Sequence, residues 1–169
     1  MLLQAIVLVG CPVFLALGAM TDMLSYRIPN WIPGALIVLF AVAAPLAGVP
    51  LPTVGLHALV FVAALLLGMA LFAFNLIGGG DAKFLAAAAL WMGPAMIVKY
   101  FFAFALAGGV LAMLILLLRR LPMPASASRV PVLNQLLLPN AGIPYGIALG
   151  LGALIVLPGT ELFMKAMTL

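Results

Sequence analysis

Charged residues are scarce in this sequence. Asp, Glu, Lys and Arg together make up 6% of its 169 residues, whereas 68% are hydrophobic and the mean hydropathy is +1.42. The hydrophobic runs do not alternate polar and apolar side chains, as the strands of a membrane β-barrel do. No segment has the apolar patterning from which a soluble domain could be built. The composition therefore predicts an all-α, polytopic membrane protein.

Cysteine is almost absent. The one copy, Cys11, lies inside the first hydrophobic run, so the chain can form neither a disulfide framework nor a cysteine zinc site. We therefore expect no metal and no cofactor. The basic residues are too thinly spread for a nucleic-acid-binding surface. Their one cluster, Arg119-Arg120 with Arg129, is typical of charges that orient a chain in a membrane.

A helix of about 20 apolar residues can cross the hydrocarbon core of a bilayer. Runs of this kind predict six transmembrane helices in a single domain over residues 1–169, with a longer cytoplasmic loop at 119–142. The helices are expected at residues 2–20, 31–49, 54–77, 84–98, 100–118 and 143–164.

Basic residues favour one side of this topology. The loops after the first, third and fifth helices carry Arg27, Lys83 and the arginine cluster, whereas the other side has Lys99 and Lys165. Because loops rich in basic residues stay in the cytoplasm, both termini are predicted to lie outside. The expected location is the inner (cytoplasmic) membrane, with the lipid bilayer as a partner and the oligomeric state open.

Acidic residues are rarer still, and two of the three are the aspartates Asp22 and Asp81. Each follows a long hydrophobic run, and an ionisable group so close to hydrocarbon is costly, which makes both candidates for a functional site. Two predicted helices separate them. An even number of crossings returns the chain to the same face, so the two carboxylates can meet.

A pair of carboxylates suits the hydrolysis of an amide. Two carboxylates that share a site do not both ionise easily, so one proton stays on the pair. The ionised member can take a proton from a water as the water attacks a carbonyl, and the protonated member can donate to the carbonyl oxygen. This chemistry needs neither a nucleophilic serine nor a metal.

The residues beside the aspartates fit this use. Gly78-Gly79-Gly80 would let a substrate backbone approach Asp81, and three glycines leave the loop able to adopt positive φ. Asn30 is placed to cap the second predicted helix.

Three motifs resemble those of the type IV prepilin peptidases, which are polytopic aspartic peptidases of the GxGD class. The motifs are Asp22 with Arg27-Ile28-Pro29-Asn30, then Gly78-Gly79-Gly80-Asp81-Ala82-Lys83, then Ile143-Pro144-Tyr145-Gly146 before the last helix. The match covers essentially the whole chain and is close to the compact branch that accompanies Flp-type pili and pseudopilins. The resemblance implies removal of a short basic leader from prepilin or pseudopilin precursors at the cytoplasmic face. It implies that Asp22 and Asp81 are catalytic and that Gly78 and Gly80 are the motif glycines.

The chain departs from larger members of that family in one respect. Those members carry a tetracysteine zinc domain after the first helix and also methylate the new amino terminus, whereas here only residues 23–30 occupy that position. We do not predict methyltransferase activity.

Three further residues have more than one interpretation. Arg27 marks the cytoplasmic side, or it positions Asp22 or meets an acidic residue of the substrate. Lys83 is a membrane anchor or a member of the site, and residues 81 and 83 of one helix do not face each other. Tyr145 lies on the aspartate side and is a candidate to line the site.

Other functions would use the same aspartates differently. An ion-coupled transporter or channel could bind a cation with Asp22 and Asp81, but it would be expected to hold its acids near the midplane and to contain internal repeats. A presenilin-like protease would cut inside the membrane, but its first aspartate typically follows a tyrosine within a helix. A membrane scaffold without enzymatic activity gives no reason for the glycine run.

Overall fold

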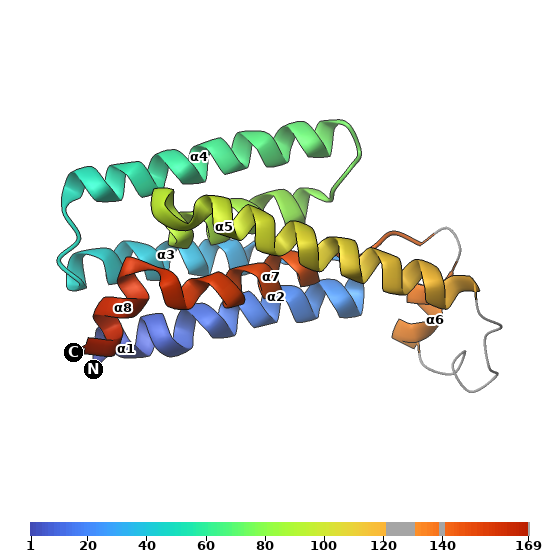
Figure 1. Ribbon diagram of the computed structural model, residues 1–169, viewed down its shortest axis with the longest axis horizontal. Coiled ribbons are helices and arrows are strands. Elements are labelled where there is room, and N and C mark those ends of the chain that lie inside the picture. The colour runs from blue at the N-terminus through green and yellow to red at the C-terminus, as the bar shows by residue number, and fades with distance from the viewer. Residues whose placement is uncertain (121–130, 139–140, 169) are drawn as a thin grey trace.

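The structure is a computed structural model that describes residues 1–120, 131–138 and 141–168 (Figure 1), and within these residues it contains helices and no strand. In chain order the elements are α1 (Leu2–Gln4), the π-helix η1 (Ala5–Gly10), α2 (Cys11–Ser25), α3 (Trp31–Leu46), α4 (Leu51–Ala73), α5 (Gly79–Arg120), α6 (Pro131–Leu137), α7 (Tyr145–Val156), the 3₁₀ helix η3 (Leu157–Gly159) and α8 (Glu161–Thr168).

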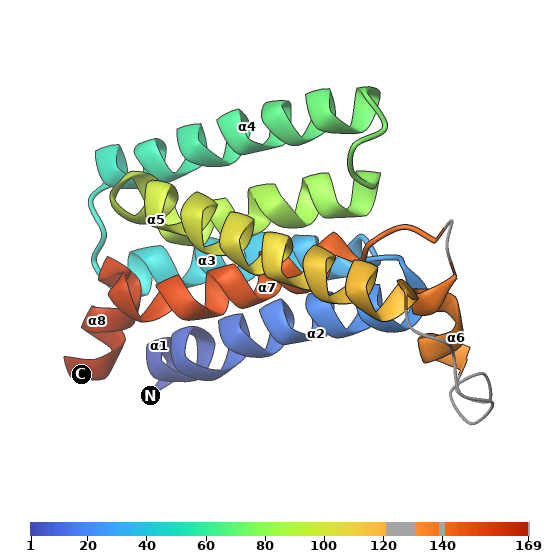
Figure 2. The same cartoon turned by 45° about the vertical axis from the view of Figure 1, so that its right-hand side comes forward.

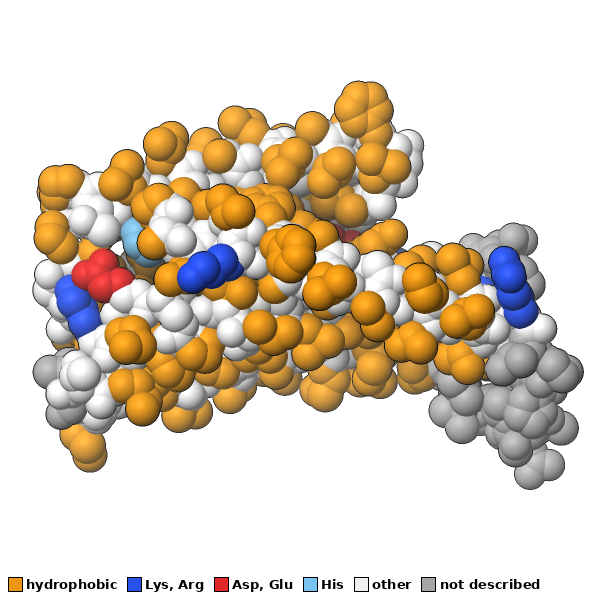
Figure 3. Space-filling view, in the orientation of Figure 1, with side chains coloured by type: hydrophobic (Ala, Val, Ile, Leu, Met, Phe, Trp, Pro, Cys, Tyr) orange, Lys and Arg blue, Asp and Glu red, His pale blue; other side chains and the backbone are white. Residues whose placement is uncertain are grey.

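Several helices have the length and composition of membrane spans. The stretches Leu2–Ser25, Leu51–Ala73 and Gly79–Arg120 are long and apolar enough to cross a membrane, and the bent pair Tyr145–Gly159 and Glu161–Thr168 can supply a fourth span. The helix α3 is apolar but shorter. Hydrophobic side chains cover most of the face seen in Figure 3. The protein is therefore the all-α membrane protein that its composition predicts.

The longest helix, α5, folds back on itself (Figures 1 and 2). A straight helix of its 42 residues would be about 63 Å long, twice the thickness of the hydrocarbon core. Gly93 interrupts it with φ 59° and ψ −173°, a conformation that glycine adopts at little cost. The predicted fourth and fifth helices are thus the two limbs of α5. Their boundary lies at Gly93 and not between residues 98 and 100, where the sequence analysis placed it.

Pro94, next to this break, leaves a backbone carbonyl without its helical donor. A proline has no N–H, so the carbonyl of Leu90, four residues earlier, cannot be satisfied within the helix. His57 of α4 supplies the bond, because its Nδ1 lies 2.7 Å from the Leu90 oxygen in a buried position. Inside a membrane protein such a replacement is needed, since hydrocarbon offers no alternative partner. His57 is therefore a structural histidine whose hydrogen bond is satisfied inside the bundle.

The first limb of α5 forms the centre of the bundle. Every residue from Phe84 to Met92 is buried, and the Trp91 indole donates to the Leu36 carbonyl of α3 over 3.0 Å. α4 and α5 pack against each other, and α7 contacts both α2 and α5 (Figure 1). This packing fixes the start of α5, and with it Asp81, against neighbouring helices.

Some predicted boundaries shift in the structure. The first long helix continues to Ser25, so Asp22 lies within α2 and not beyond its end. Likewise α5 already begins at Gly79, which places Asp81 in its first turn. The predicted loop 119–142 contains α6, while residues 121–130 and 139–140, and with them Arg129, lie outside the described residues.

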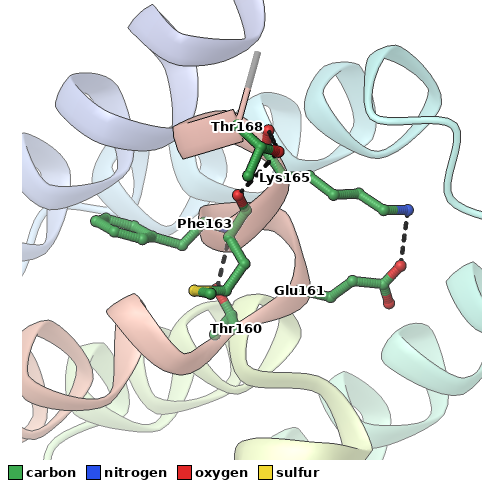
Figure 4. Close-up of polar contacts among 6 residues, drawn as sticks. Thr160, Glu161, Phe163, Lys165 and Thr168 are labelled. Atoms are coloured by element: carbon green, nitrogen blue, oxygen red, sulfur yellow. Dashed lines mark hydrogen bonds and ion pairs between the residues drawn. The ribbon is translucent and has the colours of Figure 1, made fainter.

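The last predicted helix, 143–164, is not a single helix. α7 and α8 are bent by 54° where Pro158 and Gly159 form the turn η3. Figure 4 shows that the Thr160 hydroxyl accepts the amide of Phe163 and that Lys165 pairs with Glu161 over 2.7 Å. α8 lies at the same end of the bundle as the amino terminus, away from the end of α2 (Figure 1).

Candidate active site

A cavity of about 480 Å³ lies where α2 ends and α5 begins. Two segments of the chain contribute to it: the last turn of α2 with the loop that follows, and the loop that opens α5. Its lining consists of Asp22, Tyr26, Arg27, Ile28, Pro29, Asn30, Gly78, Gly79, Gly80 and Asp81. The structure thus brings both aspartates to one cavity, in agreement with the count of crossings between them.

Asp22 is held by an amide from the far end of the sequence. Its side chain is buried, and its Oδ2 accepts the N–H of Gly146 in the first turn of α7 over 2.7 Å. A Cβ at position 146 would lie 2.7 Å from the Asp22 Cβ and 2.8 Å from its Oδ2, so only glycine lets the two chains approach this closely.

Gly146 belongs to the third motif, in which the neighbouring Tyr145 is the predicted site residue. Tyr145 does not line the aspartate cavity. It borders a smaller cavity with Ile77 and Leu149 instead. Successive residues at the start of a helix point in different directions, so a motif alone does not say which member meets the site.

Asp81 is bound by its own loop. Its side chain is buried, and its Oδ2 accepts the amide of Gly78 over 3.1 Å. This contact resembles helix capping and leaves the other carboxylate oxygen, Oδ1, available. Gly80 passes close to the other segment, because a Cβ there would lie 3.2 Å from the Ile28 carbonyl oxygen.

The glycine run before Asp81 does not use the positive φ that is open to glycine. Among the described residues, positive φ occurs at Gly48 and Gly93 and at two other residues, Tyr26 and Asn75. The glycines before Asp81 therefore allow neighbouring chain segments to approach closely and do not provide an unusual backbone conformation.

Tyr26 is a cavity residue that the sequence analysis missed. It ends α2 in the left-handed conformation, with φ 52°, and its amide donates to the Asp22 carbonyl over 2.8 Å. Its hydroxyl oxygen is buried and has no hydrogen-bond partner among the described residues. Burial raises the pKa of this hydroxyl above its ordinary value; Arg119 opposes the shift and Asp22 adds to it. The group therefore remains protonated and able to donate.

The two basic residues of the motifs differ in position. Arg27 lines the cavity, but in the described part of the chain the one ion pair is that of Glu161 with Lys165. Lys83 lies outside this lining, and its Nζ donates to Oδ1 of Asn30 over 2.9 Å. Asn30 occupies the expected N-cap position of α3, but its side chain makes no capping bond: the amide oxygen joins α3 to α5 instead.

Arg119, at the end of α5, holds the segment that leads to Gly146. Its guanidinium donates to the carbonyls of Leu136 (3.0 Å), Ala141 (2.9 Å) and Gly142 (3.3 Å). From the sequence, Arg119 is expected only to orient the chain in the membrane. Nothing in the local sequence points to these carbonyl partners, which lie 17 to 23 residues away.

No group of three His, Cys, Asp or Glu side chains in the described ranges is placed to hold a metal ion. Comparison with known families adds the decisive observation. The sequence model of the type IV leader peptidase family matches residues 9–117, which include both aspartates and the glycine run.

The chain belongs to the type IV leader peptidase family. Comparison with curated proteins and with solved structures gave no significant match. Membership makes the protein a peptidase related to those that act on prepilin-type substrates, and it favours this class over a transporter or a scaffold. The family match ends before α7, so the amide that binds Asp22 comes from outside the matched region.

Proposed function

We propose that this protein is an aspartic endopeptidase that removes the short basic leader from type IV prepilin or pseudopilin precursors. The observation that carries the proposal is the shared cavity: two of the three acidic residues of the chain, distant in sequence, line one space of about 480 Å³. Two acids in one cavity of a membrane protein lower its stability, which makes the pair a candidate for a functional role.

In the proposed mechanism the pair holds one proton and one water. The ionised aspartate takes a proton from the water, whose oxygen attacks the carbonyl carbon of the leader peptide bond. The protonated aspartate donates to the carbonyl oxygen, and the resulting tetrahedral species breaks down as its nitrogen receives a proton. The Gly146 and Gly78 amides orient one oxygen of each carboxylate and leave the others for water and substrate.

Tyr26 is proposed to assist at the carbonyl oxygen. Its hydroxyl is protonated, lies near the same cavity and is not committed to another group of the described chain. A donor placed where negative charge develops lowers the barrier to acyl transfer.

The proposed location is the cytoplasmic face of the inner membrane, with both termini outside. Arg27, Lys83, Arg119 and Arg120 belong to the segments near the cavity end of the bundle, and basic residues favour the cytoplasmic side. The precursor would present its leader there while its hydrophobic helix remains in the bilayer.

The test is cleavage of a prepilin-type precursor co-expressed with the wild-type chain, with Asp22→Asn and with Asp81→Asn. Each variant should insert and accumulate normally but lose leader removal. The remaining acid provides a matched control, because Glu161→Gln removes the same charge from the exposed pair on α8 and should cleave normally. Full cleavage by either aspartate variant would rule out the mechanism.

Mass spectrometry of the products separates this function from that of a presenilin-like protease. A leader peptidase cuts once, at the junction between the basic leader and the hydrophobic helix. A cut within the hydrophobic helix would contradict the proposal.

A further inference from the structure

A second hollow adjoins the aspartate cavity on the side of α3 and α4. Its volume is about 600 Å³, within the range of cavities that hold ligands. Asn30 and Gly79 belong to the linings of both hollows, so a peptide bound at the aspartates can continue into the second one without crossing a helix. We call the second hollow the α3/α4 groove.

The lining of the α3/α4 groove is apolar except at one end. Of its eleven lining residues, Asn30 and Lys83 alone carry polar side chains. The Lys83 ammonium donates a hydrogen bond to the Asn30 side chain beside the aspartate cavity. Away from that end the groove is bordered by side chains such as Ile37, Phe61 and Met69. Polarity therefore decreases along the path that leads away from the aspartates.

We propose that the α3/α4 groove binds the apolar segment of the substrate next to the bond that is cut. This inference rests on the proposed function. The proposed substrate has a basic leader on one side of that bond and a hydrophobic helix on the other, and only the hydrophobic helix matches an apolar lining. Burial of one or two of its side chains would favour substrates that carry the helix over those that lack it.

The exposure of the groove agrees with an occupant that arrives from the membrane. Ile37, Met69 and Phe72 are 37%, 55% and 52% exposed, although each borders a concave surface. The helices α3 and α4 leave this side open, so the hydrophobic helix of a precursor can enter laterally. An acyl chain or a second copy of this protein are the other possible occupants, and the experiment below distinguishes them.

Gly34 provides a way to fill the groove without disturbing the fold. It lies on α3 in the groove, and a Cβ there would meet nothing within 4 Å. Gly34→Leu should therefore place an isobutyl group into the groove, and leucine is also the better helix former. Gly55→Leu on α4 is the matched control, because its Cβ also meets nothing within 4 Å and it borders neither the groove nor the aspartate cavity.

The measurement is kcat/KM of the purified full chain for two substrates: a precursor with its hydrophobic helix, and a peptide that ends a few residues after the cut bond. Gly34→Leu should lower the preference for the precursor over the peptide about tenfold or more. Gly55→Leu should leave both values as in the wild type. An unchanged preference in Gly34→Leu would overturn the groove assignment, and is the result expected if the groove holds lipid.

A photoreactive amino acid identifies the occupant directly. Placed at Ile37 or Met69, it should crosslink to the precursor, whereas at Ile155, which is 68% exposed on α7, it should not. Crosslinks only between copies of the protein, or only to lipid, would overturn the proposal. If the proposed function itself is wrong, the wild type cleaves neither substrate, an outcome distinct from loss of preference in Gly34→Leu.

Discussion

The amide nitrogen of Gly146 lies 2.7 Å from Oδ2 of Asp22, although 124 residues separate the two in the chain. The bond joins α7 to α2 at the aspartate cavity and sets the direction of one carboxylate. A hydrogen bond from a backbone amide to a carboxylate is both short and strong, so the position of α7 and the geometry of the site depend on each other.

Substitution of Gly146 by alanine tests this dependence. The new methyl group would lie within 3 Å of Asp22, so either the carboxylate or α7 must move and the hydrogen bond is lost. A displacement of about 1 Å can cost about 10²-fold in rate, and kcat for leader removal should fall accordingly. Gly142→Ala is the control, since a Cβ there meets nothing within 4 Å and activity should be retained. Equal activity of the two variants would show that the Gly146 contact is not needed.

Arg119 and its neighbour Arg120 form a natural pair for a second experiment. Arg119→Gln removes charge-assisted bonds to the carbonyls that precede α7, which together contribute about 2–3 kcal/mol. The exposed Arg120 makes no such bond to a residue that the structure describes. Arg119→Gln should therefore lower both the thermal unfolding midpoint in detergent and the rate of leader removal.

Arg120→Gln removes the same charge from the same membrane side. If Arg119 acted only through the orientation of the chain, the two variants would behave alike. If only Arg119→Gln lowers the unfolding midpoint and the rate of leader removal, Arg119 acts by positioning α7. Equal decreases in both variants would contradict this role.

Tyr26→Phe separates catalysis from packing at the cavity. The variant keeps the ring and removes a buried hydroxyl that has no partner among the described residues, so stability should be unchanged or slightly higher. If the hydroxyl donates to the carbonyl oxygen, kcat should fall about 10–100-fold while KM changes little. Normal turnover with unchanged stability would limit Tyr26 to packing.

His57→Leu tests the hydrogen bond that satisfies the Leu90 carbonyl beside the break in α5. Without the imidazole, the buried Leu90 carbonyl has no donor in place of the missing N–H of Pro94, which should lower the free energy of unfolding by about 1–3 kcal/mol. His57→Gln retains an N–H donor of similar reach, so its free energy of unfolding should fall by less than that of His57→Leu. The two variants are compared by thermal unfolding in detergent, and equal losses would argue that the ring packing against Phe40, not the hydrogen bond, matters.

The sequence by itself determined the class of the protein and the face on which its two aspartates lie. Hydrophobic runs specify membrane helices because burial in lipid depends on local composition, and the shared face of Asp22 and Asp81 follows from counting crossings between them. The motifs around the aspartates also identified the family, since they keep their order along the chain.

Only the tertiary structure decided which groups surround the two carboxylates. The Gly146 amide, the hydroxyl of Tyr26 and the Arg119 contacts with the segment before α7 depend on side-chain directions and on packing between distant segments. The backbone of Gly146 meets Asp22 because this position of α7 faces α2 and carries no side chain, whereas the next position along the helix is turned by about 100°. The Gly93-Pro94 pair is a local signal for the break in α5, but the donor that satisfies the Leu90 carbonyl there comes from His57 of another helix, and no local pattern predicts that contact.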